Sequence, residues 1–185
     1  SAGKLAFGTV DTFLIWQLTK GRVHATDVTN ASRTLLYPLN LDPEATWSET
    51  MTDLLDVPTS LLPEVKPSGA AFGETDPDLF GRAIPILSAI GDQQAALVGQ
   101  ACLAPGTAKI TYGTGAFLVA NTGHEAPKSD HRLLGTLGYA IEGGGEAYAI
   151  EGAIFNAGTV VQWLRDELGL ISDAAESEAK AAKLS

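Results

Sequence analysis

A carboxylate and two amides follow one another at the end of an apolar run near the middle of the chain. Asp92 comes after residues 83–90, which are almost all apolar, and Gln93 and Gln94 come next. A carboxylate at the carboxyl end of a buried strand lies where open α/β sheets bind ligands, and it can accept a proton from a substrate hydroxyl or hold a metal. The two amides carry both donors and acceptors, which suits the hydroxyls of a polyol.

The same residues also have a purely structural interpretation. Residues 93–101 are predicted to form a close-packed helix, and an Asp just before a helix is a favoured N-cap that stabilises it by about 1 kcal/mol. One side chain cannot serve fully in both roles, so the cap competes with the base. Gln93 and Gln94 could equally lie exposed on the first helical turn. Position alone leaves these alternatives open.

A second candidate is the turn Gly113-Thr114-Gly115, which is flanked by residues 109–112 and 117–121. The flanking segments predict two strands and hence a hairpin. Two glycines allow positive φ values and let a phosphate approach backbone N–H groups, and Thr114 adds a hydroxyl donor. The alternative is an ordinary hairpin turn.

A third candidate is the pair Gly158 and Gln162, four residues apart in a predicted helix over residues 154–168 and therefore on one face. Gly158 lacks a side chain, so a flat ligand could press against the backbone there, and Gln162 could then form a hydrogen bond with a nucleotide. The alternative is close helix packing with a solvated glutamine.

The elements that must position these residues alternate between helices and strands, which predicts an α/β chain. In the first helix Val10, Leu14 and Leu18 share an apolar face with Phe13. The predicted helices cover residues 9–18, 42–57, 93–101, 154–168 and part of 172–185. The predicted strands cover residues 22–26, 83–90, 109–112, 117–121, 133–141 and 146–151.

Composition narrows the function classes. The chain has 185 residues, a net charge of −10 and no cluster of lysines and arginines, so a nucleic-acid partner is not expected. No apolar run approaches the ~20 residues that span a bilayer, so no membrane partner is expected either. The single cysteine, Cys102, allows no disulfide within the chain, which fits a cytoplasmic protein, and it is expected to be a packing residue.

In their order along the chain, these motifs resemble the FGGY family of carbohydrate kinases, and within it most closely the members that phosphorylate glycerol. The resemblance covers nearly the whole chain. Its carriers are Gly8-Thr9-Val10-Asp11-Thr12, Thr26-Asp27, Thr29-Asn30-Ala31-Ser32-Arg33-Thr34, Gly91-Asp92-Gln93-Gln94-Ala95-Ala96-Leu97, Thr111-Tyr112-Gly113-Thr114-Gly115 and Gln162-Trp163-Leu164-Arg165-Asp166.

The resemblance implies an actin-like, ribonuclease-H-like α/β fold of two domains with a cleft between them. Residues 1–101 would then be the C-terminal part of the substrate-binding domain, and residues 102–185 the first part of the ATP-binding domain. Asp92 would be the general base on the glycerol 3-hydroxyl. Gln93 would line the polar end of the glycerol pocket and Phe117 its apolar end. Thr114, Gly158 and Gln162 would contact ATP.

The resemblance further implies ATP with Mg²⁺ as the cofactors, with the metal bridging the phosphates and no residue of this chain assigned to it. Family members are much longer, so the chain is expected to be an internal fragment without kinase activity of its own, and its open strand edges should favour self-association. The full-length protein is expected to be a homo-oligomer. The alternatives are a kinase of another polyol or sugar, or a non-catalytic actin-like nucleotide-binding module.

Overall fold

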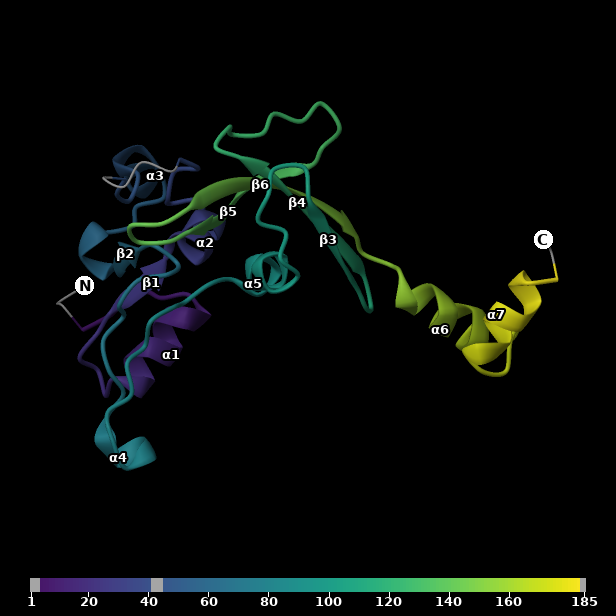
Figure 1. Cartoon of the computed structure of the whole chain (residues 1–185), viewed down its shortest axis with the longest axis horizontal. Coiled ribbons are helices and arrows are strands. Elements are labelled where there is room, and N and C mark those ends of the chain that lie inside the picture. Colours follow the sequence, from purple (N-terminus) through teal and green to yellow (C-terminus); the bar gives the residue numbers. More distant parts are fainter. Residues whose placement is uncertain (1–3, 41–44, 184–185) are drawn as a thin grey trace.

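The computed structural model describes residues 4–40 and 45–183. The first half of the chain surrounds a short parallel pair of strands, β1 (Ala25–Asp27) and β2 (Glu64–Lys66). Helix α1 (Val10–Leu18) packs beside them, and its Ile15 joins Ala25 and Phe72 in a small buried cluster. Helix α2 (Val28–Ala31) and a 3₁₀ turn (Ser32–Thr34) follow β1 directly, so β1 leads straight into the polar segment of the sequence (Figure 1).

Two further short helices begin at side-chain caps on the surface of this half. In α3 (Glu49–Leu54) the Ser48 hydroxyl accepts a hydrogen bond from the Met51 N–H. In α4 (Pro77–Phe80) the Asp76 carboxylate accepts one from the Asp78 N–H. Such caps satisfy N–H groups that have no partner inside the helix. A second 3₁₀ turn (Thr59–Leu61) leads into β2.

The second half contains a four-stranded antiparallel sheet in the order β3-β4-β6-β5. Its strands are β3 (Ala108–Tyr112), β4 (Ala116–Gly123), β5 (Leu134–Ala140) and β6 (Glu146–Ile154). Both predicted hairpins are therefore confirmed, one across Gly113–Gly115 and one across residues 141–145. The register shifts between Asn121 and Gly123 and again between Leu137 and Tyr139, as β-bulges do.

The sheet is packed against the first half at two places. Helix α5 (Asp92–Gly99) lies along β3 and β4, where Leu97, Cys102, Val119 and Ala149 form a buried cluster. On the edge strand β5, Leu137 packs against Ala31, the last residue of α2. Cys102 is thus a packing residue, as predicted. These contacts hold the start of α5 at a fixed place relative to β3 and β4.

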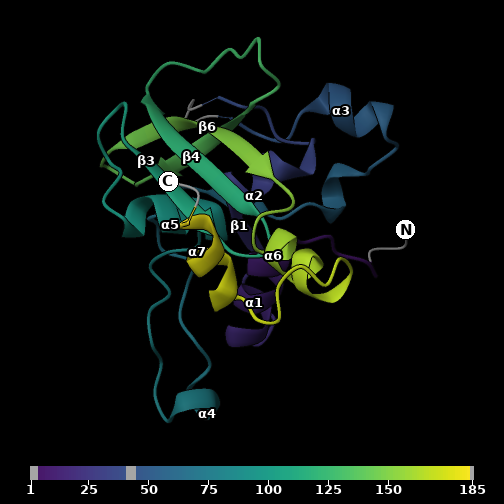
Figure 2. The ribbon, with the colours of Figure 1, turned by 90° about the vertical axis from the view of Figure 1, so that its right-hand side faces the viewer.

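Helices α6 (Gly158–Asp166) and α7 (Ala175–Ala181) follow β6 and extend away from the remainder of the chain (Figure 1). In Figure 2 the same two helices face the viewer. No side chain of α6 is buried, and Trp163 is 51% exposed. The apolar stripe that the sequence predicts on this helix therefore has little to pack against in the described part of the chain.

The predicted buried strand over residues 83–90 is wrong. This segment is an extended loop that forms hydrogen bonds with residues 68–75 on one side, among them Phe72 N–H to Ile86 O at 2.8 Å and Thr75 N–H to Ile84 O at 2.9 Å. Leu87 is 67% exposed. A buried strand needs neighbours on both edges, and within the described residues only one edge has them. Asp92 consequently follows a loop, not a strand.

Four helix and strand boundaries also differ from those predicted. The helix predicted from residue 42 begins at Glu49, while Asp42-Pro43 lies outside the described residues. The helix predicted over residues 154–168 begins at Gly158. The strand predicted over residues 22–26 is β1, which covers Ala25–Asp27 and so begins three residues later. Helix α1 begins at Val10, one residue later than predicted, and it buries Thr12 and Ile15 while Val10 is 75% exposed. No helix among the described residues is long and apolar enough to span a bilayer.

Candidate active site

Asp92 is the first residue of α5, and its carboxylate is exposed. The N-cap is Gly91, so the cap interpretation of Asp92 is wrong by one residue. One carboxylate oxygen accepts a hydrogen bond from the N–H of Gln93 at 2.8 Å, which holds the side chain beside the start of the helix. The remaining oxygen lone pairs stay available to an incoming hydroxyl.

A pocket of about 150 Å³ surrounds this carboxylate. Three further charged groups lie nearby. Glu151 on β6 forms an ion pair with Arg33 at 3.4 Å, and the charges of Glu151 and Asp92 both act on Lys109. The pocket therefore has a polar lining of both charge signs, which suits a neutral, polar ligand. The lining residues are Thr29, Asn30, Arg33, Gly91, Asp92, Gln93, Gln94 and Glu151.

A chain of hydrogen bonds fixes the backbone immediately before Asp92. The Gly91 N–H donates to the Thr29 hydroxyl at 2.9 Å, and that hydroxyl donates to the Asp27 carboxylate at 2.7 Å. The Ser68 hydroxyl donates to the same carboxylate at 2.7 Å. The end of β1 therefore positions the start of α5, although the two are more than sixty residues apart in the sequence.

Asp27 is completely buried and is the N-cap of α2. Besides the two hydroxyls, its oxygens accept from the N–H groups of Thr29 and Asn30 and from the Asn30 amide. Burial raises the pKa of the Asp27 carboxyl, and these hydrogen bonds oppose that rise. The buried Asp27 carboxylate thus joins the start of α2 to Ser68 through hydrogen bonds.

Lys109 brings two of the predicted substrate residues together. It lies on β3, is 1% exposed, and its ammonium donates to Gln93 Oε1 and to the Thr111 hydroxyl, the latter at 2.8 Å. The Phe117 carbonyl lies 3.5 Å from the same nitrogen. Gln93, Phe117 and, through Gln93, Asp92 are thus gathered around one buried cation.

Gln94 behaves differently from both of its predicted alternatives. It is neither exposed nor available to a ligand through its amide nitrogen, because it is 4% exposed and donates to the Thr136 hydroxyl on β5 at 3.1 Å. Its Oε1 lies 2.7 Å from the place where a side chain at Gly91 would begin. The glycine at position 91 therefore gives Gln94 room to reach the sheet.

The turn Gly113-Thr114-Gly115 is joined to the start of α6. The Gly158 N–H donates to Gly113 O at 2.9 Å, and the Ala157 N–H donates to Thr114 O at 2.9 Å. Neither glycine of the turn has a positive φ, contrary to the expectation from sequence. Gly115 is required for a different reason: a Cβ there would lie 2.7 Å from the Ile154 carbonyl oxygen.

Gly158 is close-packed against backbone. A Cβ on this residue would lie 2.6 Å from Gly113 O, a contact that real Cβ atoms do not make. Gly158 thus keeps the turn against the helix. Thr114 is exposed, and its hydroxyl forms no hydrogen bond within the described part of the chain, so it is available to a ligand.

Replacing Gly158 by Ala should loosen this junction. The added methyl group forces the turn and α6 apart at a cost of about 1–3 kcal/mol, so amide hydrogen exchange in the first turn of α6 should accelerate about 5- to 100-fold. Gly99→Ala is the matched control, because nothing lies within 4 Å of the Cβ position there. Unchanged exchange in Gly158→Ala would contradict the tight contact.

Gln162 lies one turn further along α6 and is exposed. A pocket of about 360 Å³ lies on this helix, lined by Asn156, Thr159, Val160 and Trp163. Gln162 and Thr114 are not among its lining residues, and this pocket and the one around Asp92 are separate. The structure therefore brings Asp92 and Gln93 together in one pocket and joins Thr114 with Gly158. Phe117 has only its backbone carbonyl near Lys109, and neither Phe117 nor Gln162 lines either of these two pockets.

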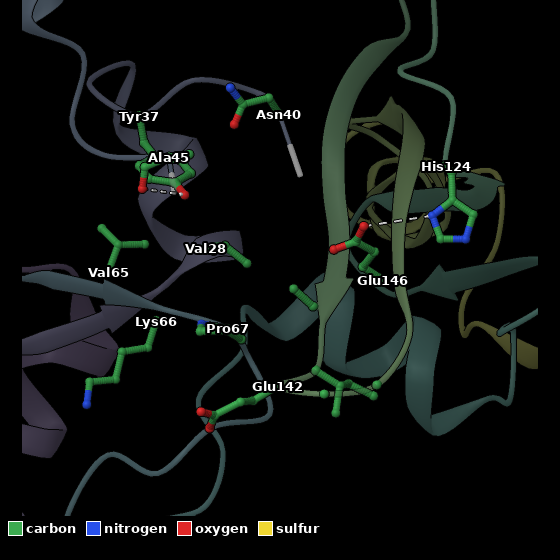
Figure 3. A pocket seen from close by; sticks show the side chains of 14 residues that line it. Val28, Tyr37, Asn40, Ala45, Val65, Lys66, Pro67, His124, Glu142 and Glu146 are labelled. Carbon is green, nitrogen blue, oxygen red and sulfur yellow. Dashed lines mark hydrogen bonds and ion pairs between the residues drawn. The ribbon is translucent and has the colours of Figure 1, made fainter. Parts of the chain in front are cut away.

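A larger pocket of about 470 Å³ lies between the first half and the β5–β6 hairpin. Figure 3 shows Val28 and Val65 on one wall, with His124 and Glu146 facing one another on the other. The His124 ring nitrogen and the Glu146 carboxylate are 3.9 Å apart. None of the predicted site residues lines this pocket.

Sequence reasoning missed Lys109, Arg33 and Glu151 as members of the site. One signal was present, since Lys109 and Thr111 are two apart in a strand and so share a face. Arg33 and Glu151 are partners 118 residues apart in the sequence, and no local pattern relates them. No group of three or more His, Cys, Asp or Glu residues suited to a metal ion occurs among residues 4–40 and 45–183.

Comparison with known proteins places this geometry in a family. Residues 2–99 match the N-terminal domain of the FGGY family of carbohydrate kinases. A glycerol kinase of Alcanivorax borkumensis is 57% identical over 183 residues, which are 99% of this chain and 36% of that protein. A crystal structure of Plasmodium falciparum glycerol kinase with ADP is 41% identical, with a TM-score of 0.86 over 96% of this chain and 35% of that one.

More distant relatives share the fold. A xylulose kinase from Rhodospirillum rubrum is 19% identical and superposes with a TM-score of 0.72 over 92% of this chain and 34% of that one. The α/β architecture is thus the actin-like fold of these kinases. The chain spans about a third of the length of these relatives. By its sequence over residues 2–99 and its structure over most of its length, the chain belongs to the FGGY family of carbohydrate kinases.

Proposed function

We propose that the full-length protein carrying this chain transfers the γ-phosphoryl group of ATP to the 3-hydroxyl of glycerol. The observation that carries the proposal is the exposed Asp92 carboxylate in a small polar pocket, beside a glutamine held by a buried cation. The 57% identity to a glycerol kinase, over nearly the whole chain, supports glycerol over other acceptors.

In the proposed reaction Asp92 is the general base. It accepts the proton of the 3-hydroxyl while that oxygen attacks the γ-phosphorus, the bond to the β-phosphate oxygen breaks, and ADP leaves. Phosphoryl transfer passes through a loose transition state, so the protein mainly orients the reactants and balances charge. Gln93 would bind a glycerol hydroxyl, and Phe117 would face the carbon chain.

ATP would bind on the side of the Gly113–Gly115 turn. The Thr114 hydroxyl has no other partner within the described chain, and Gln162 is exposed on α6 beyond it. Gly158 would contribute by holding the turn against the helix. The Plasmodium relative, crystallised with ADP, supports an adenine nucleotide as the donor.

Mg²⁺ is proposed as the counter-ion of the ATP phosphates. When bound, Mg²⁺ neutralises phosphate charge.

Domain organisation and assembly belong to the same proposal. We place the domain boundary near residues 101–102, which the family match to an N-terminal domain over residues 2–99 supports. Closure of the two domains would exclude water from the reacting groups. A cytoplasmic location, which the lone cysteine supports, and homo-oligomeric assembly of the full-length protein are part of this proposal.

Assay of the purified full-length protein tests this function. We expect ADP release from ATP that depends on glycerol, with glycerol 3-phosphate as the product. Xylulose and gluconate serve as alternative acceptors in parallel reactions. Faster turnover with either would show another sugar specificity, and nucleotide binding without turnover on any acceptor would indicate a non-catalytic module.

A further inference from the structure

Lys109 is one of the largest fully buried side chains of the described structure, although lysine is rarely buried without partners. Three oxygens surround its ammonium: Gln93 Oε1, the Thr111 hydroxyl and the Phe117 carbonyl. An ammonium has three donor hydrogens, so each has an acceptor within reach. These three acceptors fix the position of the Lys109 ammonium.

Two carboxylates lie near the Lys109 ammonium. Burial lowers the pKa of Lys109, and the charges of Glu151 and Asp92 oppose part of that fall. Glu151 is itself 7% exposed and sits on β6, the strand beside β4. The cation is therefore held between the sheet and the first turn of α5.

This contact decides which way the Gln93 amide points. A glutamine side chain alone can present either its carbonyl or its NH₂ group to a ligand. An ammonium is only a donor, so Gln93 must turn its carbonyl oxygen toward Lys109. Its NH₂ group is then the end left for the pocket, where it can donate to a hydroxyl oxygen.

We propose that Lys109 is a positioning residue for substrate recognition: it fixes the Gln93 amide so that the pocket presents a donor NH₂ next to the acceptor carboxylate of Asp92. A donor beside an acceptor matches a compound with neighbouring hydroxyl groups, one accepting from Gln93 and one donating to Asp92. This inference rests on the proposed glycerol kinase function, and it adds the group that sets the polarity of the site.

A double-mutant cycle in the full-length protein tests the proposal. Lys109→Met removes the cation at similar length, and Gln93→Ala removes the amide. Each single variant should raise the glycerol KM about 5- to 10-fold, with a smaller change in the ATP KM, because one oriented hydrogen bond is lost. In the Gln93→Ala background, Lys109→Met should change the glycerol KM less than 2-fold, since its partner is already absent. Independent, multiplicative effects would overturn the proposal.

A matched control and a milder variant keep the test decisive. Lys66→Met removes a second lysine, whose side chain is partly buried and whose ammonium donates to the Ala71 carbonyl at 3.1 Å. This variant should leave the glycerol KM unchanged. If Lys109→Met does not fold, Thr111→Val decides, because it removes one partner of the ammonium. It should raise the glycerol KM about 2- to 3-fold only while Gln93 is present.

The outcomes separate this inference from the function on which it rests. A wild-type protein without glycerol-dependent turnover would remove the proposed function. An active wild-type enzyme whose Lys109→Met variant folds and keeps the wild-type glycerol KM would remove only the role of Lys109.

Discussion

Replacing Asp92 by Asn in the full-length protein should lower kcat for glycerol phosphorylation by about 10²- to 10⁴-fold, roughly 3–5 kcal/mol in the activation barrier. The amide has nearly the shape of the carboxylate, and its oxygen can still accept from the Gln93 N–H, so the start of α5 should be preserved. What the amide cannot do is take the proton of the attacking hydroxyl. Steady-state kinetics with glycerol and ATP measure the loss.

Nucleotide binding distinguishes lost chemistry from a damaged fold. The dissociation constant of ATP, measured by calorimetry, should stay within about 2-fold of wild type in Asp92→Asn, because the proposed ATP contacts lie on the hairpin turn and α6. Asp53→Asn makes the same exchange at an exposed position of α3 and should retain full activity. Wild-type turnover in Asp92→Asn would exclude Asp92 as the base.

The second large effect is expected at Asp27. Its carboxylate is completely buried and accepts from the N–H groups of Thr29 and Asn30, the Asn30 amide and the hydroxyls of Thr29 and Ser68. Asp27→Ala leaves all these donors without their acceptor and removes the N-cap of α2. We expect a loss of about 3–5 kcal/mol in the free energy of unfolding, measured by urea denaturation of the full-length protein.

An aspartate at the surface provides the comparison. The Asp78 side chain is 79% exposed and forms an ion pair with Lys20 at 2.6 Å. Exposed pairs of this kind contribute little, so Asp78→Ala should cost less than about 1 kcal/mol. Equal losses in the free energy of unfolding of Asp27→Ala and Asp78→Ala would contradict a stabilising role of the hydrogen-bond network at Asp27. Asp27→Asn should lie between them, since one amide oxygen can still accept.

These variants concern two supports that meet at the first turn of α5. From one side, the Asp27 carboxylate holds the Thr29 hydroxyl, which accepts from the Gly91 N–H. From the other, Lys109 holds the Gln93 carbonyl. Asp92 lies between the two anchored residues. A base that must meet a hydroxyl within hydrogen-bond distance needs such fixation, because small displacements of reacting groups are costly.

Features encoded by neighbouring residues were predictable from the sequence. A helix was predicted over residues 93–101, and α5 covers Asp92–Gly99. Both hairpins of the second half were predicted from glycine turns between short strands, and both are present. The order of the motifs was sufficient to indicate the family, and the match over residues 2–99 confirms it. Local hydrogen bonding and the residue types of the turns determine these features, so a short window of residues is enough to predict them.

Features that depend on neighbours distant in the sequence were not predictable in this way. Residues 83–90 are apolar enough for a buried strand, but a buried strand also needs neighbouring strands on both edges. The sequence of the segment does not show whether such neighbours exist, and here hydrogen bonds form with residues 68–75 on one edge. Likewise α1 has an apolar stripe that its own sequence presents as a core face, yet Val10 is 75% exposed. Burial is a property of the surroundings as much as of the residue.

The sequence by itself determined the residue types of the site: an acid and an amide at the start of a helix, and a glycine-bounded turn with a hydroxyl. Only the tertiary structure decided how they are held. It buried Lys109 against Gln93, turned Gln94 away toward Thr136, and placed Gly113 O where Gly158 has no side chain. The reason is physical: each of these contacts joins different secondary-structure elements, and the packing of those elements brings the atoms together.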